Sequence, residues 1–479
     1  MQCRNARNRA GLKRSIAAVA GRRRSRTARA VESVPDVKPR RLSDAEIAEN
    51  FSDMHPPLSR AEALIEADRC YFCYDAPCTE ACPTDIDIPG FIQKIRSDNI
   101  NGAAHTILRE NIMGGMCARV CPTEILCEEA CVRMTHEEKP VRIGLLQRHA
   151  TDPVFEEDVQ LFTRGRETGK NVAVVGSGPA GLSCAHRLSM LGHNVVILNR
   201  DDKPGGLNEY GIAAYKTVND FAQREAEWIL SIGGIELRSG VALGDDFSLE
   251  QLREEYDAVF LAFGLGGTNR LNVANEDIDG VLNAVDYISQ LRQADDKGDL
   301  PVGRNVVVIG GGMTAIDIAV QTKRLGSERV DIVYRRGPEQ MGASQYEQEF
   351  AQTSGVHIQH WSQPKRLLVE DRVSGVEFER TTIDADGTLR STGETWSLNA
   401  DIVFKAVGQT ANTHILGKLA KELRQQNGKL VVDDNRMTTL PDIWAGGDCI
   451  YGHDDLTVTA VQDGKIAAKA IDRYLAAGD

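Results

Sequence analysis

The sequence predicts an α/β protein with two Rossmann-like domains, the second inserted in the first, behind an N-terminal all-α domain. Two segments, 171–198 and 305–334, each show a buried strand, a glycine turn, an amphipathic helix and a second strand, which is the pattern of a βαβ unit. After the second unit, IWAGGD at 443–448 again indicates a strand and a turn, which favours a return to the first domain. Residues 41–165 instead show short helical stretches broken by prolines and rich in cysteine.

The length and charge of the chain limit the classes of protein to consider. With 479 residues it exceeds what one hydrophobic core usually organises. No run approaches 18 apolar residues, so we expect no membrane-spanning helix. The net charge is −13, and residues 1–31 hold ten cations and no acid, so −13 minus 10 leaves −23 for the remainder. Such an acidic body argues against nucleic acid as a partner.

The first 40 residues are basic and show no periodic hydrophobic pattern. We predict a disordered tail at 1–40, because nothing in this segment can build a core. Two other interpretations stay open: a mitochondrial transit peptide, which an Arg-rich and acid-free start resembles, and an upstream-extended start codon. Clustered cysteines in an acidic chain indicate a reducing compartment, for which the cytoplasm is the default.

Residues 41–165 are predicted to form a helical domain that binds metal. Capping boxes at Ser43 (SDAE) and Ser59 (SRAE) mark two helix starts. Eight of the eleven cysteines lie between Cys70 and Cys131, as C-x2-C-x4-C-x3-C-P and C-x3-C-P-x4-C-x3-C. This is enough thiolate for two iron–sulfur clusters, and a Cys-Pro at the end of such a run sends its last cysteine to the neighbouring cluster. Structural zinc is the alternative, although zinc sites usually combine two C-x2-C pairs and only one is present.

The first βαβ unit contains the glycine turn of a dinucleotide site. Its G-x-G-x-x-G run, GSGPAG, spans residues 176–181, and PGGL follows at 204–207. The three glycines allow a tight turn, the approach of a pyrophosphate and close packing of helix on strand, while the helix N-terminus faces the negative charge. Asn199 is a departure, because an acid is expected there to bond the ribose; an amide can still bond a hydroxyl.

The second βαβ unit contains a G-x-G-x-x-A turn, GGGMTA, at 310–315. Its second strand ends in Arg335 and Arg336, where an acid would select NAD. A guanidinium at this place can pair with a 2'-phosphate, but both arginines could equally be solvated surface charges. NADH and NADPH therefore both stay open.

Few other residues indicate a catalytic, binding or metal-ligating role. Asp448 follows two glycines after a short apolar strand, and we expect it to reach the sugar-like chain of a flavin; a helix-capping acid is the alternative. Cys184 and Cys449 are expected to be small buried residues. No histidines have a metal-ligand spacing, and the sequence shows no Ser-His-Asp or paired-carboxylate arrangement.

From about residue 41 onward these motifs together resemble one known family. The chain is similar to the small flavin and iron–sulfur subunit of bacterial NAD-dependent dihydropyrimidine dehydrogenase, to the N-terminal half of the single-chain animal enzyme and, more distantly, to the glutamate synthase small subunit. The resemblance rests on CYFCYDAPCTEACPTDIDIPGFI at 70–92, CARVCPTEILCEEAC at 117–131 and RIGLLQ at 142–147. The glutamate synthase branch typically has a glutamate where this chain has Gln147, so Gln147 favours the pyrimidine branch.

The resemblance implies two 4Fe-4S clusters with four ligands each. The first set comprises Cys70, Cys73, Cys78 and Cys131. The second set comprises Cys82, Cys121, Cys127 and Gln147. Cys117 would be left out, and an amide oxygen in place of a thiolate would change the charge and hence the potential of the second cluster. Without the family pattern, Gln147 would be taken for a surface helix residue.

The resemblance also implies FAD and a nicotinamide coenzyme, NADH or NADPH. The residues implied for FAD are Gly176, Ser177, Gly178, Pro179, Ala180, Asn199, Gly206, Leu207, Lys216, Gly447, Asp448 and Thr457. Those implied for the nicotinamide coenzyme are Gly311, Gly312, Met313, Thr314, Arg335, Arg336, Ala406, Val407 and Gly408. Asn199 replaces the usual Glu. Gly342 stands where the animal enzyme has another phosphate-binding Arg, which favours NADH slightly.

The expected domains are a helical two-cluster domain at 41–165, an FAD-binding domain at 166–285 and 407–479, and an NAD(P)-binding domain at 286–406. We expect electrons from NAD(P)H to pass through FAD and the clusters to a catalytic subunit that contains FMN and iron–sulfur centres and reduces uracil and thymine, in a heterotetramer. Because the chain ends soon after Tyr474, the FMN domain is expected on another polypeptide. The alternatives are a glutamate synthase small subunit that delivers NADPH electrons to a large subunit, and a zinc-stapled flavin scaffold without turnover.

Overall fold

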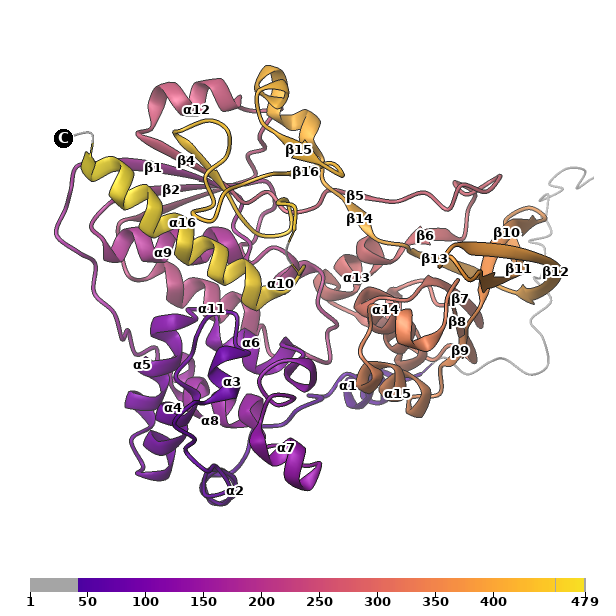
Figure 1. Ribbon diagram of the computed structural model, residues 1–479. Helices are drawn as coiled ribbons and strands as arrows, with labels where there is room; N and C mark the ends of the chain where they lie inside the picture. The colour runs from indigo at the N-terminus through magenta and orange to yellow at the C-terminus, as the bar shows by residue number, and fades with distance from the viewer. Residues whose placement is uncertain (1–41, 453, 478–479) are drawn as a thin grey trace, which may run out of the picture. The chain divides into compact units, whose positions relative to one another are not determined.

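The computed structural model describes residues 42–452 and 454–477 (Figure 1). The basic segment predicted at 1–40 lies outside these residues. Along the described chain, a helical region is followed by a parallel sheet, a second parallel sheet, and a return to the first. None of the helices described has both the length and the apolar character to cross a bilayer.

The helical region begins with two capped helices, α1 (Asp44–Asn50) and α2 (Arg60–Ala67). The side chains of Ser43 and Ser59 each accept a hydrogen bond from the amide three residues on, and the side chain of the glutamate at that position accepts one from the backbone amide of the serine. Both predicted helix starts are therefore confirmed. The remaining helices are α3 (Pro77–Glu80), α4 (Ile88–Arg96), α5 (Ile100–Glu110), α6 (Gly114–Val120), α7 (Val132–Glu137) and α8 (Ile143–Glu156), with a 3-10 turn η1 (Thr123–Ile125).

One apolar core holds α2, α4, α5 and α8 together. Phe91, Ile92 and Ile95 of α4 are spaced to lie on one face of the helix, and all three are buried. They share this core with Ile107 of α5 and Leu146 of α8. The loops that contain most of the cysteines emerge between these helices, so the packed helices position them.

The first sheet is parallel throughout, in the order β17-β4-β1-β2-β3. Its strands are β1 (Asn171–Val175), β2 (Asn194–Asn199), β3 (Ile235–Ser239), β4 (Ala258–Leu261) and β17 (Ile443–Ala445). Alternate residues of β1 enter two different cores, Val172 and Val174 on one face and Ala173 and Val175 on the other. A sheet that is buried on both faces explains the unbroken apolar run of β1.

Helices cover both faces of this sheet (Figure 1). α9 (Pro179–Met190), α11 (Phe221–Leu230) and α16 (Thr457–Ala477) contribute to the core on one face, and α12 (Leu249–Glu255) with the 3-10 segment η4 (Thr413–Lys421) contributes to the other. The short helix α10 (Leu207–Tyr210) follows β2.

The topology places the second sheet as an insertion in the first. β17 pairs in parallel with β4, Ile443 opposite Val259, although every strand of the second sheet lies between them in the sequence. The chain crosses between the sheets at an antiparallel pair, β5 (Gly267–Thr268) with β14 (Gln409–Thr410). A small pair, β15 (Gln425–Gln426) with β16 (Lys429–Leu430), precedes the return. The predicted helical region followed by two Rossmann-like α/β units is confirmed, while the exact domain boundaries stay a prediction.

The second sheet is also parallel, in the order β6-β13-β7-β8-β9. Its strands are β6 (Val281–Asn283), β7 (Asn305–Gly310), β8 (Arg329–Val333), β9 (His357–Gln359) and β13 (Ile402–Ala406). α13 (Ala284–Gln293), α14 (Met313–Arg324) and α15 (Gln345–Thr353) pack on one face. Two 3-10 turns, η2 (Lys297–Asp299) and η3 (Pro338–Gln340), complete the connections.

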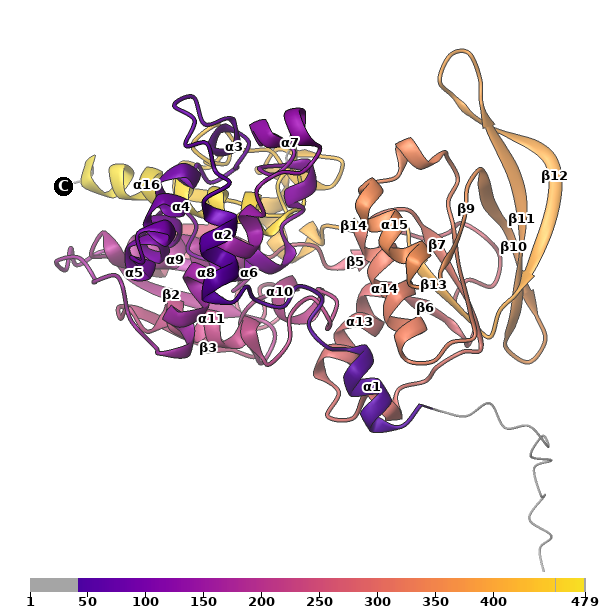
Figure 2. The ribbon, with the colours of Figure 1, turned by 90° about the horizontal axis from the view of Figure 1, so that it is seen from below.

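An antiparallel sheet that the sequence analysis did not anticipate covers the other face. It is the meander β10 (Ser362–Val369), β11 (Val373–Ile383) and β12 (Leu389–Asn399). Val376 and Phe378 of β11 share a core with Val307 and Ile309 of β7. Figure 2 shows this sheet on the side of β7 and β8 away from α13 and α14. The Asp386-Gly387 turn between alternating segments was the local signal for it.

Helix α1 packs with the second sheet and not with the helices that follow it. Ile47 and Phe51 lie in the core that contains α13 and α14. The Asn50 side-chain amide donates to the carbonyl of Arg324 at 2.9 Å, and the Arg324 guanidinium donates to the carbonyl of Asn50 at 2.7 Å. The start of the described chain therefore fastens the helical region to the second sheet.

Candidate functional site

The first glycine turn joins β1 to α9 and leaves no room for side chains at two of its glycines. Gly176 has φ +102°, and a Cβ there would overlap the carbonyl of Ala262. A Cβ on Gly181 would overlap the carbonyl of Gly176. Gly178 differs, because its closest neighbour would be Gly206 at 3.9 Å. The start of α9 thus faces open space lined by backbone, which is what a pyrophosphate requires.

Asn199 braces the loop that follows β2. Its Oδ1 accepts a hydrogen bond from Ser177 N at 3.4 Å, and its Nδ2 donates to the carbonyls of Asp201 at 2.6 Å and Lys203 at 3.2 Å. A carboxylate has no hydrogen to donate and could not make the last two bonds. The departure from the expected acid therefore has a structural reason. The hydroxyl of Ser177 is buried without a partner among the described residues, so a polar atom at this turn is left for a ligand.

Segments distant in the sequence meet at this turn. Gly447 lies against Ala180, since a Cβ on Gly447 would come within 3.1 Å of the Ala180 Cβ. Thr457, the first residue of α16, donates to Asn208 Oδ1 at 2.8 Å. The predicted FAD residues Pro179, Gly206, Leu207 and Asp448 adjoin these contacts in the chain. The structure thus brings most of the residues predicted for FAD close to one another, and their role toward FAD stays a prediction.

Lys216, also predicted for FAD, is tied to the second sheet instead. Its Nζ lies 2.8 Å from Asp317 Oδ1 on α14 and 3.3 Å from Glu347 Oε1 on α15. Burial opposes the charge of Lys216, but Asp317, the hydroxyl of Tyr215 and Glu347 outweigh it and raise its pKa. Lys216 is therefore a half-buried cation that links the two sheet regions, and its role toward FAD stays a prediction.

The second glycine turn joins β7 to α14, and here too some glycines are required by packing while another leaves open space. A Cβ on Gly310 would overlap the carbonyl of Ala406, and one on Gly311 would overlap the ring of Tyr334. A Cβ on Gly312 would meet nothing within 4 Å. The first two glycines are thus required by packing, and the third leaves space where a ligand would approach α14.

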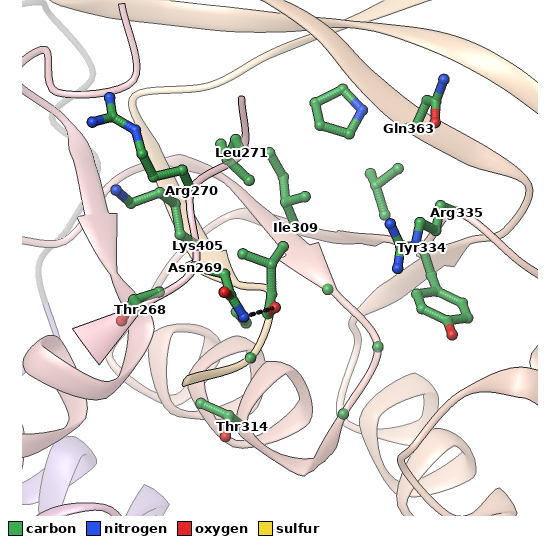
Figure 3. Close-up of a pocket in the computed structure, with 18 of the residues that line it drawn as sticks. Thr268, Asn269, Arg270, Leu271, Ile309, Thr314, Tyr334, Arg335, Gln363 and Lys405 are labelled. Atoms are coloured by element: carbon green, nitrogen blue, oxygen red, sulfur yellow. Dashed lines mark hydrogen bonds between the residues drawn. The ribbon is translucent and has the colours of Figure 1, made fainter. Parts of the chain in front are cut away.

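A cavity of about 840 Å³ opens at this turn (Figure 3). The predicted nicotinamide-site residues that line it are Gly311, Gly312, Thr314, Arg335, Ala406, Val407 and Gly408. Met313 and Arg336, which were also predicted, are not among the described residues that line it. Of the two arginines, Arg335 is therefore the one in position to contact a coenzyme in this cavity.

The sequence analysis missed two cations and an amide of this cavity. Arg270 and Lys405 line it together with Arg335, and none of the described lining residues is Asp or Glu. The side-chain amide of Asn269 donates to the carbonyl of Val407 at 3.2 Å, the dashed line of Figure 3. These residues belong to no local motif, so only the folded chain brings them to the turn. Arg270 is paired with Glu276 and Asp277, so Arg335 and Lys405 supply the positive charge that suits a phosphorylated ligand.

The cysteines of the described residues are free thiols, and eight of them form two groups. In the first group, burial raises the pKa of Cys78 to about 12, with further contributions from Cys131 and Cys70. Burial likewise raises the pKa of Cys70, and Cys131 and Cys73 add to it. The four predicted ligands of the first set therefore lie within electrostatic reach of one another. All four are partly exposed.

The second group lies deeper. Burial raises the pKa of Cys121 well above its usual value, and Cys117, Cys127 and Cys82 raise it further. Cys82, Cys117 and Cys127 are buried. The structure thus places Cys117, which the sequence analysis left out, beside three predicted ligands. The seven-cysteine-plus-glutamine ligand set stays a prediction.

Gln147 lies on α8 and is not a surface residue, since only 7% of it is exposed. Its side-chain Nε2 donates to the carbonyl of Gly114, at the start of α6, at 2.7 Å. The amide nitrogen is therefore engaged with backbone, and the oxygen is the atom that remains for a ligand.

The donor chemistry of both groups suits iron. Crowded thiols with raised pKa values resist ionisation together, and a bound cation relieves this repulsion by replacing the protons. Among the described residues, no three or more His, Cys, Asp or Glu side chains are arranged to hold a single metal ion. In a four-iron cluster each thiolate binds a different iron atom, so the ligands surround a cluster and not one ion.

Two family models match the chain. Residues 170–464 match "Pyridine nucleotide-disulphide oxidoreductase", and residues 47–159 match "Dihydropyrimidine dehydrogenase domain II, 4Fe-4S cluster". The second match supports iron–sulfur over zinc for the cysteine groups. The two matches together span the helical region and both sheets.

Curated relatives and solved structures agree with these matches. The NAD-dependent dihydropyrimidine dehydrogenase subunit PreT of Salmonella typhimurium is 36% identical over 430 residues, 89% of this chain and 98% of that protein. The glutamate synthase (NADPH) small chain of Escherichia coli is 35% identical over 463 residues, 92% of this chain and 96% of that protein.

Two solved structures show the same fold at lower identity. Mycobacterium tuberculosis FprA in complex with NADPH has a TM-score of 0.55 at 21% identity, over 64% of this chain and 85% of FprA. Lactococcus lactis thioredoxin reductase has a TM-score of 0.52 at 21% identity, over 64% of this chain and 99% of that structure. The chain therefore belongs to the family of NAD(P)-dependent flavin and iron–sulfur oxidoreductase subunits that includes PreT and the glutamate synthase small chain.

Proposed function

We propose that this chain is the electron-input subunit of a dihydropyrimidine dehydrogenase. In this proposal electrons pass from NADH or NADPH by way of FAD and two 4Fe-4S clusters to a catalytic partner that contains FMN and iron–sulfur centres and reduces uracil and thymine to their 5,6-dihydro forms. The observation that supports it most is the buried Gln147, with its amide nitrogen engaged by Gly114. The similarity to PreT, named as a subunit of that enzyme, points the same way.

In this proposal the chain's own residues bind and orient the cofactors. The backbone of residues 176–181 and the start of α9 would hold the FAD pyrophosphate, and the cavity at Gly312 would hold the coenzyme. When bound, the flavin supplies the conversion of a hydride into single electrons, which a nicotinamide cannot perform. No acid or base of this chain has to act on a pyrimidine, so the partner would supply that chemistry.

The coenzyme is proposed to be NADH or NADPH, with Arg335 as the residue that distinguishes them. Its guanidinium could pair with the 2'-phosphate of NADPH, and Lys405 adds positive charge to the same cavity. Gly342 also lines the cavity and contributes no second guanidinium. Replacement of Arg335 by alanine should raise KM for NADPH more than KM for NADH if this pairing is made. Equal changes in both KM values would exclude it.

An assay with and without the partner tests the proposal. The purified chain should reduce ferricyanide with NADH or NADPH, contain about eight iron atoms, and leave uracil unchanged. Co-expression with the catalytic subunit of a PreT-type enzyme, as the proposed heterotetramer, should add uracil reduction. Reduction of uracil by the chain alone would contradict the division of labour. One or two zinc atoms in place of iron would contradict electron transfer altogether.

The second candidate is a glutamate synthase small subunit. The 35% identity to the Escherichia coli small chain, over 92% of this chain, favours it nearly as much as the PreT match favours the first. Co-purification with a glutamate synthase large subunit, and NADPH-dependent glutamate formation without uracil reduction, would establish this function in place of the first.

A further inference from the structure

A buried carboxylate of the first-sheet region caps a helix of the iron–sulfur region. Glu225, on α11, is fully buried. Its Oε1 accepts hydrogen bonds from Gly115 N at 2.9 Å and Met116 N at 3.0 Å, both in the first turn of α6. These two amides have no partner within α6, because the first amides of a helix never do. The cap therefore joins the region that would bind FAD to the helix that precedes Cys121.

Helix α6 begins with two glycines because neighbouring side chains fill the space around them. A Cβ on Gly115 would lie 2.5 Å from the ring of Phe221, 2.6 Å from the ring of Phe155 and 2.8 Å from Glu225 Oε1. A Cβ on Gly114 would lie 2.6 Å from the Ile107 side chain. The backbone of α6 is thus pressed directly against α11, and a shift of either helix would be felt by the other.

Both ends of α6 reach residues predicted to bind the second cluster. At its start, the carbonyl of Gly114 accepts the Nε2 hydrogen bond of Gln147. At its end, Cys121 closes the helix through its amide, which donates to the carbonyl of Cys117 at 3.0 Å. The cap at the first turn therefore fixes the bond that orients Gln147 and the place from which Cys121 extends. Such supporting contacts set the orientation of metal ligands and tune the metal.

The bonds of Glu225 do not require its negative charge. Burial raises the pKa of Glu225 to about 8, although the bonds from Met116 and Gly115 and the nearby Arg119 partly oppose this. Both amides bind Oε1, and Oε2 has no partner among the described residues. A proton on Oε2 would leave the two bonds intact. Glutamine could make the same bonds through its oxygen, whereas aspartate is one methylene shorter and could not reach.

We infer that Glu225 is a positioning residue for the second iron–sulfur site, which it holds in place through α6, Gly114 and Gln147. The inference rests on the part of the proposed function that assigns a cluster to Cys82, Cys121, Cys127 and Gln147. It goes further in naming a residue outside the helical region that controls this site. The first-sheet region would then determine the properties of the cluster and not only lie beside it.

The test uses the holo-protein and distinguishes a positioning role of the Glu225 side chain from a role of its charge. Glu225→Asp keeps the carboxyl group and loses the reach, while Glu225→Gln keeps the reach and replaces the carboxyl group with an amide. Glu227→Gln, on the exposed side of the same helix, is the matched control. Each variant is examined by EPR-monitored redox titration, iron content and NAD(P)H–ferricyanide activity.

We expect Glu225→Asp to shift or split the EPR signal of one cluster, to move its potential, and to leave the other cluster and KM for NAD(P)H unchanged. Transfer from coenzyme to that cluster should slow about tenfold or more. Glu225→Gln and Glu227→Gln should resemble the wild type. Wild-type spectra for Glu225→Asp, or an altered spectrum for Glu225→Gln alone, would overturn the inference. Because these readouts need no partner, a failure to reduce uracil would count against the proposed function and not against the role of Glu225.

Discussion

The two groups of cysteines differ in depth and in what holds them. The first group is partly exposed, and its loop presents Tyr71 and Tyr74, which are 53% and 105% exposed. The second group is mostly buried and is braced by the first-sheet region through Glu225. Electron transfer becomes slower with distance, so a cluster beside the flavin region would receive electrons first and one near the surface would pass them on. We therefore expect the second group to be the entry and the first to be the exit.

A second contact strengthens this contrast. Lys465, on α16, donates to the carbonyl of Thr84 at 2.8 Å and lies 3.1 Å from Glu110 Oε2. The hydroxyl of Thr84 in turn lies 3.3 Å from Cys82 Sγ. Two helices of the first-sheet region thus reach the segments that contain the second group, α11 through Glu225 and α16 through Lys465. The two groups of cysteines therefore differ in the elements that pack on them.

The most severe test removes one ligand from each group. Cys121→Ala should leave the first cluster reducible by dithionite but no longer by NAD(P)H, whereas Cys73→Ala should leave the second cluster reducible by NAD(P)H. Both variants should lose partner-dependent activity by about 100-fold or more. Rapid-freeze EPR after mixing with NAD(P)H measures the reduction of each cluster. If Cys73→Ala prevented reduction of the second cluster, the order of the two groups would be the reverse of the one expected.

The next test changes the charge of the second group alone. Gln147→Cys would put a thiolate where a neutral amide is proposed to bind, so the potential of that cluster should become more negative. The potential of the first cluster should not move. EPR-monitored redox titration measures both. A shift confined to the first cluster, or none in either, would show that Gln147 is not a ligand of the second group.

The effect of pH on stability tests whether water reaches the junction between the helical and first-sheet regions. His186, on α9, packs on Phe162 and stacks on Trp228, with ring centroids 5.4 and 6.4 Å apart, and its Nε2 has no partner among the described residues. Burial, with a contribution from Arg187, lowers the pKa of His186 to about 3 from 6.5. The unfolded chain therefore takes up the proton first, and stability is lost as the pH falls below 6.5 toward 3.

Between pH 6.5 and 5 this loss should amount to about 2 kcal/mol of unfolding free energy. His186→Leu should abolish it, whereas His357→Leu, at an exposed histidine, should retain it. Denaturant unfolding at the two pH values measures the difference. Equal losses in the wild type and in His186→Leu would mean that His186 is hydrated.

The smallest expected effect comes from one hydroxyl. A cluster-bound thiolate has no proton, so Thr84 must be the donor in its contact with Cys82 Sγ. Thr84→Val keeps the shape of this fully buried side chain and removes the bond, which should make the potential of the second cluster modestly more negative. The shift should be smaller than that of Gln147→Cys. A shift as large as that, or one in the first cluster, would contradict the assignment of Cys82.

The features that sequence analysis predicted correctly are local. The capping boxes at Ser43 and Ser59 are satisfied within four residues, and each glycine turn lies between the strand and helix that it joins. The features it missed depend on contacts between distant segments. Arg270 and Lys405 reach the coenzyme cavity only because β5 and β13 are brought to the same place, and the β10–β12 sheet shares no motif with the nucleotide-binding units.

The sequence by itself determined the order of the regions, the positions of the two glycine turns and the supply of thiolates, because strand–turn–helix units and cysteine spacings are short-range properties of the chain. Only the tertiary structure decided which cysteines are deep and which are near the surface, that Asn199 braces a loop, and that Glu225 and Lys465 reach across to the second group. Burial and the partners of a buried charge depend on which surfaces pack together, and that is settled by the whole folded chain.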